Sequence, residues 1–123
     1  MKKCILILLI VASGFGAKAQ FEGTKWKTTL QLESPTDVVF AFGKDTVEAL
    51  LADNNMPLET MLYTVKDSVI TLQKVTGQSD CDGNVVGKYK FEMKGDEVQV
   101  TLVSDDCYNR SNVLSNVSMS KMK

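Results

Sequence analysis

Apolar and polar residues alternate with a period of two through most of this 123-residue chain. Residues 25–33 read KWKTTLQLE, so tryptophan, threonine and two leucines fall on one face, while charged and amide side chains fall on the other. This pattern is typical of a β-strand with one buried and one solvated face. It recurs around residues 38–42, 45–51, 61–65, 70–72, 87–93 and 96–102, and residues 115–122 are expected to add a last strand. The sequence therefore predicts eight strands.

Short turns join most of these strands, which favours antiparallel neighbours. An open meander of eight strands would leave two unpaired edges, and closing the sheet removes both. We therefore predict an all-β, single-domain, antiparallel up-and-down barrel over residues 20–123. A sandwich of two four-stranded sheets fits the same alternation and is the competing architecture.

Matching the apolar faces also predicts the registers of two hairpins. A turn at residues 94–95 sets Phe91 opposite Val98, Tyr89 opposite Val100 and Gly87 opposite Leu102, and a turn at residues 66–67 sets Tyr63 opposite Ile70 and Met61 opposite Leu72.

The first of these registers, extended outward, brings Cys81 to within one position of Cys107. No Cys-x-x-Cys arrangement is present, so the spacing favours a structural disulfide over a redox-active pair. A disulfide that encloses about 25 residues contributes roughly 3 kcal/mol in the chain-entropy model.

The first 19 residues have the features of a secretory signal peptide. Two lysines precede an apolar run, and Ala17-Lys18-Ala19 supplies a small-x-small ending. The run is too short to span a bilayer as a membrane anchor, the alternative reading. We predict cleavage before Gln20 and export to the periplasm, the cell surface or the medium, with no transmembrane segment in the mature chain. Cys4 would be removed with the leader.

The mature chain would carry 11 basic and 15 acidic residues, a net charge near −4, which disfavours a nucleic-acid partner. The chain contains no histidine, the commonest general base and a leading zinc ligand. The acidic pairs Asp105 with Asp106 and Asp80 with Asp82 are interpreted as solvated loop residues. Residues 80–84 have a faint likeness to a calcium loop, but the twelfth position, which needs a glutamate, is Phe91. We predict no catalytic residue, no metal site and no cofactor.

Three short motifs resemble those of small secreted lipocalin-like proteins of bacteria, which share the calycin type of barrel. They are Phe21-x-Gly23-x-x-Trp26, Gly87-Lys88-Tyr89-Lys90-Phe91 and Asp105-Asp106-Cys107-Tyr108-Asn109-Arg110. In lipocalins a tryptophan near the start and an arginine near the end meet at the closed end of the barrel. The resemblance implies that Trp26 stacks on Arg110 at one end, next to the disulfide. Ligand contacts are then expected at the opposite rim, near residues 94–95 and 66–67. In the alternative, Trp26 is an ordinary core residue and Arg110 an ordinary surface charge.

Three functions are consistent with such a chain. The leading hypothesis is a non-enzymatic exported barrel that binds a small hydrophobic ligand in its lumen or at its mouth. The residues expected to line the lumen are Phe40, Phe42, Met61, Tyr63, Tyr89 and Phe91. The rival is a compact module with a solid core whose loops, such as residues 52–57 and 78–84, contact another protein or a surface polymer. A carboxylate-based hydrolase is the third and weakest hypothesis.

The disulfide prediction has a direct chemical test. The purified mature protein should contain no free thiol, because both of its cysteines are paired. Titration of the denatured, unreduced protein with a thiol reagent measures this. Two reactive thiols per chain would refute the pairing.

Overall fold

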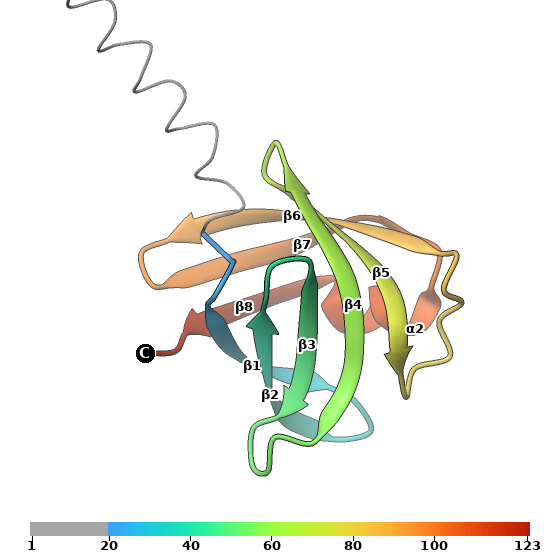
Figure 1. The fold of residues 1–123 in the computed structure, drawn as a ribbon, viewed down its shortest axis with the longest axis horizontal. Helices are drawn as coiled ribbons and strands as arrows, with labels where there is room; N and C mark the ends of the chain where they lie inside the picture. The colour runs from blue at the N-terminus through green and yellow to red at the C-terminus, as the bar shows by residue number, and fades with distance from the viewer. Residues whose placement is uncertain (1–19) are drawn as a thin grey trace, which may run out of the picture.

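The computed structural model describes residues 20–123, and the predicted leader with Cys4 lies outside the described residues. Within these residues, eight strands and one short helix follow one another (Figure 1). They are β1 (Lys25–Gln31), β2 (Pro35–Phe42), β3 (Thr46–Leu51), β4 (Pro57–Lys66), β5 (Val69–Gly77), β6 (Val86–Lys94), β7 (Glu97–Asp105), α2 (Tyr108–Leu114) and β8 (Asn116–Lys121).

The strands form a closed barrel in the order β1 to β8, and every neighbouring pair is antiparallel. The pairs Trp26 with Lys121 and Lys27 with Ser120 close the ring between β1 and β8. Closure leaves no free strand edge in this sheet. The predicted up-and-down barrel is confirmed, and the sandwich alternative is excluded.

Both predicted hairpin registers are wrong by two residues, although the predicted faces are right. Phe91 lies opposite Val100 rather than Val98, and Tyr63 lies opposite Leu72 rather than Ile70. Likewise, Tyr89 lies opposite Leu102 and Met61 opposite Lys74, whereas Gly87 lies opposite Asp105, three positions from the expected Leu102, because the register shifts between Lys88 and Tyr89. The two-residue turns lie one position further along, at residues 67–68 and 95–96. The positive φ values of Asp67, Ser68 and Gly95, between 51° and 65°, suit these turns.

Irregular pairing bends the sheet at three places, on the β3–β4, β4–β5 and β6–β7 ladders. Each irregularity leaves one residue without an opposite partner, and two of these are Val75 and Val103. Both valines are exposed at the surface. Bulges of this kind increase the local twist and bend that a small closed barrel requires.

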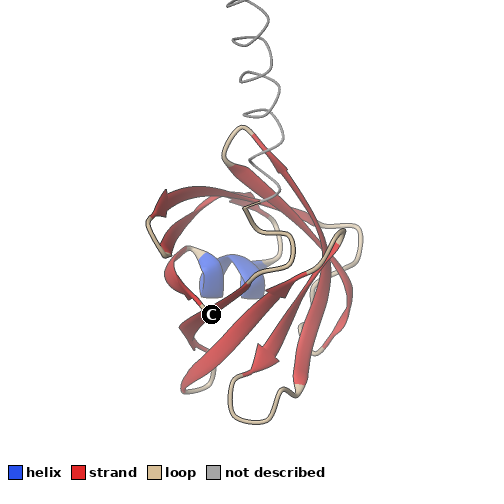
Figure 2. Ribbon diagram, turned by 60° about the vertical axis from the view of Figure 1, so that its left-hand side comes forward, coloured by secondary structure: helices blue, strands red, loops and turns tan. Residues whose placement is uncertain are grey.

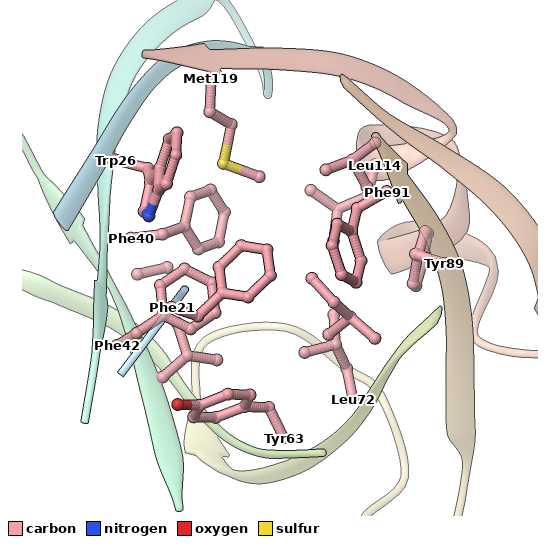
Figure 3. Close-up of a cluster of buried hydrophobic side chains, with 14 of the residues drawn as sticks. Phe21, Trp26, Phe40, Phe42, Tyr63, Leu72, Tyr89, Phe91, Leu114 and Met119 are labelled. Atoms are coloured by element: carbon pink, nitrogen blue, oxygen red, sulfur yellow. The ribbon is translucent and has the colours of Figure 1, made fainter. Parts of the chain in front are cut away.

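The barrel lumen is filled with side chains (Figure 3). All six residues predicted to line it are buried, together with Trp26, Leu72, Val98, Met119 and others. The void that remains among them measures about 30 Å³. The alternation also placed Leu32 and Leu102 on the inward face, but they are 42% and 39% exposed. Leu32 lies just beyond the last pair of β1 with β2, and Leu102 just beyond the last pair of β7 with β8.

The two ends of the barrel differ in construction. At the end that we call the turn end, β1 starts, β8 stops, and tight turns join β2 to β3, β4 to β5 and β6 to β7. At the other end, the helix end, the longer connections at residues 52–56, 78–85 and 106–115 lie, the last of which contains α2. Figure 2 shows α2 framed by the strands.

Phe21 closes the turn end. Its ring is 1% exposed and lies 4.9 Å from the rings of Phe42 and Phe91 and 6.0 Å from that of Trp26, centroid to centroid. The backbone that carries it is fixed to β2, since Gly23 N–H donates to the Phe42 carbonyl at 2.8 Å. The sequence motif that contains Phe21 therefore acts as an aromatic plug.

Replacing Phe21 tests how much this plug contributes to the stability of the fold. We expect Phe21→Ala to lower the free energy of unfolding by about 3–5 kcal/mol, the usual loss for a buried phenylalanine. Urea denaturation followed by circular dichroism measures the change. Tyr108→Ala is the matched control, because Tyr108 is 76% exposed and should give a change near zero. A loss below about 1 kcal/mol for Phe21→Ala would show that the plug is dispensable.

Candidate functional site

The helix α2 forms at the helix end without the usual sequence signals. Its residues YNRSNVL include no acidic residue in the first turn and no side-chain cap at Cys107. Asparagine, serine and valine are also weak helix formers. Tertiary contacts hold the helix instead, because Leu114 is buried in the core and Arg110 is buried at the barrel wall. Local sequence analysis therefore missed α2.

The predicted disulfide is present at the start of this helix. Cys81 and Cys107 are bonded, with their Cα atoms 5.5 Å apart. The bond joins the β5–β6 connection to the residue that precedes α2. It lies at the helix end, so the cysteines anchor the helix to the barrel.

Arg110 and Asp105 form a buried ion pair beneath α2. Arg110 Nε donates to Asp105 Oδ2 at 2.6 Å, and Arg110 Nη2 donates to Asp105 Oδ1 at 2.9 Å. Nη2 also donates to the Val85 carbonyl at 3.1 Å, and the Tyr89 hydroxyl donates to Asp105 Oδ2 at 2.5 Å. The Arg110 and Asp105 side chains are 4% and 0% exposed. This network ties α2 to β6, β7 and the β5–β6 connection.

A glycine makes room for the carboxylate. A Cβ atom at Gly87 would lie 2.3 Å from Asp105 Oδ2, so any larger residue there would displace the ion pair. Gly87 was predicted to lie opposite Leu102, but its partner in the ladder is Asp105. The glycine of the second motif is thus explained by a close approach of a charged side chain.

The network shifts the ionisation of its members. Burial alone would raise the pKa of Asp105, but hydrogen bonds from Arg110, Tyr89 and the Cys107 N–H outweigh it, so the pKa lies below its usual value. Burial, reinforced by the hydrogen bond to Asp105, raises the pKa of the Tyr89 hydroxyl. Asp105 is therefore a fixed anion and Tyr89 a fixed donor at neutral pH.

The structure does not bring Trp26 and Arg110 together, which corrects the expected stack. Trp26 lies near the turn end, paired with Phe40 and Lys121, and its Nε1 donates to Thr24 Oγ1 at 2.8 Å. Arg110 lies at the helix end and binds Asp105. The expectation failed because strand parity puts the start of β1 and the segment after β7 at opposite ends. The disulfide accordingly lies far from the Trp26 end.

A large hollow lies at the helix end, between α2 and the ends of β1 and β4. Its volume is about 550 Å³, within the range typical of small-molecule sites. Its apolar wall is formed by Leu30, Leu32, Phe40, Ala49, Leu58, Met61, Val113 and Leu114. Of the predicted ligand-binding residues it includes Phe40 and Met61, whereas Phe42, Tyr63, Tyr89 and Phe91 do not line it. This hollow, which we call the mouth hollow, lies at the opposite end of the barrel from residues 94–95 and 66–67, where ligand contacts were expected.

Three charged residues line the mouth hollow: Glu33, Glu59 and Arg110. The charge of Arg110 is compensated by Asp105, and one of its nitrogens, Nη1, is buried without a hydrogen-bond partner within residues 20–123. Polar residues such as Gln78 and Asn112 also contribute to the rim. No sequence signal pointed to Glu59, because its place at the hollow depends on how α2 packs.

The remaining candidate groups do not assemble into a reactive centre in the part of the chain that the structure describes. Asp80 accepts a hydrogen bond from Asn109, and Asp82 Oδ1 accepts one from the Asn84 N–H at 3.1 Å. Residues 20–123 contain no group of three or more His, Cys, Asp or Glu side chains arranged to hold a metal ion. Over the same residues, no helix has the length and apolar character needed to cross a membrane.

Comparisons of the chain with protein-family models, with curated proteins and with solved structures found no match.

The buried ion pair predicts a large loss of stability when its anion is removed. Asp105→Asn should lower the free energy of unfolding by about 3–5 kcal/mol, because it leaves the Arg110 charge buried and uncompensated. Denaturant titration at neutral pH measures the loss. Asp106→Asn, at the exposed neighbouring position, should change stability by less than about 0.5 kcal/mol. Equal effects of the two substitutions would contradict this account.

The same pair predicts how stability depends on pH. The pKa of Asp105 is lowered in the folded protein, so its stabilising contribution is complete above the unfolded value, about 3.9. The contribution is lost as the pH falls from there through the lower native pKa. Unfolding titrations from neutral pH to about pH 2 should show a steeper decline for the wild type than for Asp105→Asn. Parallel curves would contradict the assigned shift.

Proposed function

We propose that this protein is a non-enzymatic barrel that binds a small apolar ligand at the mouth hollow. The observation that carries the proposal is the hollow of about 550 Å³ with its apolar wall at the helix end. The lumen does not support a deep ligand site, because the void inside it is only about 30 Å³. Binding at the mouth therefore replaces binding in the lumen as the leading hypothesis.

The lipocalin-like identity and the export of the chain belong to the same proposal. A closed eight-stranded antiparallel barrel with a disulfide is consistent with both. We infer that the leader is removed before Gln20 and that the mature domain works in the periplasm, at the surface or outside the cell. Phe21 would then lie next to the new amino terminus, already inserted in the turn end.

A non-enzymatic role is supported by how the acidic residues are used. Asp105, the most buried of the four acids considered above, is fully engaged by Arg110 and Tyr89. A carboxylate-based hydrolase needs two carboxyl groups that face each other across a substrate cleft. Glu33 and Glu59 share the mouth hollow, but one belongs to the exposed β1–β2 turn and the other to the β4 wall. We rank the hydrolase hypothesis last.

A compact interaction module remains the second candidate function, because a filled lumen is what that hypothesis predicted. Its contact surface would lie around the disulfide, where Tyr108 is 76% exposed beside the β5–β6 connection. Its partner would be a protein or a surface polymer. Tyr108→Ala should abolish such an interaction while leaving ligand binding at the mouth hollow intact.

Binding of an uncharged apolar dye tests the leading proposal. N-phenylnaphthylamine should bind with a rise in fluorescence, and Val113→Trp should weaken its affinity by about tenfold or more, because the larger ring fills the mouth hollow. Val103→Trp is the control, since Val103 is exposed on the outer surface of β7. Absence of dye binding, or equal affinity for both variants, would count against the proposal. Native mass spectrometry of the protein purified from its own host would then identify a retained ligand.

A further inference from the structure

Glu59, on the wall of the mouth hollow, is a half-buried carboxylate that forms no ion pair within residues 20–123. Its Oε2 accepts a hydrogen bond from the Ser79 hydroxyl at 2.5 Å, and its Oε1 accepts one from the Ser79 N–H at 3.3 Å. Both donors are neutral. Within residues 20–123 no ion pair reaches Glu59, whereas Arg110 on the same hollow is paired with Asp105.

The carboxylate of Glu59 is also fixed in place. It lies against Gly77, where an added Cβ atom would come within 2.0 Å of Oε1 and 2.7 Å of the Glu59 Cα. Gly77 has a φ of 146°, so the backbone at this position favours glycine as well. The charge therefore cannot swing away from the mouth hollow without giving up its hydrogen bonds with Ser79.

Arg110, the cation among the residues that line the mouth hollow, cannot compensate an incoming anion. Arg110 already binds Asp105 through two nitrogens, so the pair is neutral as a whole. Glu33 adds a second negative charge at the rim. A ligand carboxylate placed in the hollow would thus meet the negative charges of Glu59 and Glu33, which repel it.

We propose that Glu59 is a specificity-determining residue that excludes anionic amphiphiles, so that the mouth hollow takes uncharged apolar molecules such as fatty esters. This inference rests on the proposed function, since it names the chemical class of the ligand for the same site. The proposed selectivity distinguishes a fatty acid anion from its ester, two ligands of similar shape, by their charge.

The test compares decanoate with methyl decanoate as competitors of bound N-phenylnaphthylamine at neutral pH. The two share one acyl chain and differ in charge. For the wild type, the ester should displace the dye at a concentration about tenfold or more below that of decanoate. Glu59→Gln, which keeps an acceptor oxygen for Ser79, should reduce the ratio of the two displacing concentrations by about tenfold, because decanoate gains affinity.

Two controls use the other acidic residues. Glu33→Gln should change the ratio less than Glu59→Gln, because Glu33 is exposed and screened by solvent. Glu92→Gln, on β6 outside the mouth hollow, should not change it.

The outcomes separate this inference from the proposed function. If the dye binds but decanoate competes as well as the ester does in the wild type, the selectivity is refuted while the ligand site stands. An unchanged ratio in Glu59→Gln refutes the role of Glu59. If the dye does not bind at all, the proposed function fails, and the inference fails with it.

Discussion

Closure of the sheet between β1 and β8 is the constraint on which the rest of the structure depends. Once eight alternating strands form a ring, one face of every strand must point into a lumen that side chains can just fill. Large residues such as Trp26, Phe40 and Tyr89 supply that volume, and the remaining void is about 30 Å³. Functional surfaces are therefore restricted to the ends and the outside of the barrel.

The two ends of the barrel are covered by different kinds of interaction. At the turn end, Phe21 inserts an apolar ring among other aromatic rings, and burial of apolar area stabilises the contact. At the helix end, a short helix of weak intrinsic propensity is held by a disulfide and an ion pair. Burying two charges is costly, and here the side-on geometry, together with donors from Tyr89 and Cys107, offsets that cost. The consequence for function is that Arg110 is used to hold the helix.

The alternation of the sequence predicted the strands, the barrel and the buried face, but it could not predict the hairpin registers. A slip of two residues keeps every side chain on its own face, so the apolar pattern fits both registers almost equally. Turn chemistry decides between them. Gly95 occupies the first turn position with a positive φ, which is common for glycine. Asp67 and Ser68 also have positive φ values, which their residue types predict only weakly.

The candidate site was less predictable, because its parts come from segments far apart in the sequence. Phe40 and Met61 were expected to face the lumen, and they do, but their contact with the mouth hollow depends on where α2 lies. The helix itself has no side-chain hydrogen bond at its N-cap, Cys107, and no acidic residue in its first turn. The stack of Trp26 on Arg110 was an inference from a motif, and strand parity alone was sufficient to separate the two residues.

The filled lumen and the open mouth hollow share a boundary, and that boundary limits how deeply a ligand can bind. Phe40, Met61 and Leu114 line both spaces, so the hollow can extend into the barrel only where one of these side chains changes its conformation. Phe40 is packed on the wall between β1 and β3, and Leu114 is carried by the anchored helix. Met61 has a flexible, unbranched side chain that can adopt several rotamers at low cost. Among these three residues, Met61 is therefore the one whose movement would let an apolar chain enter from the mouth while the ion pair and the disulfide keep the helix in place.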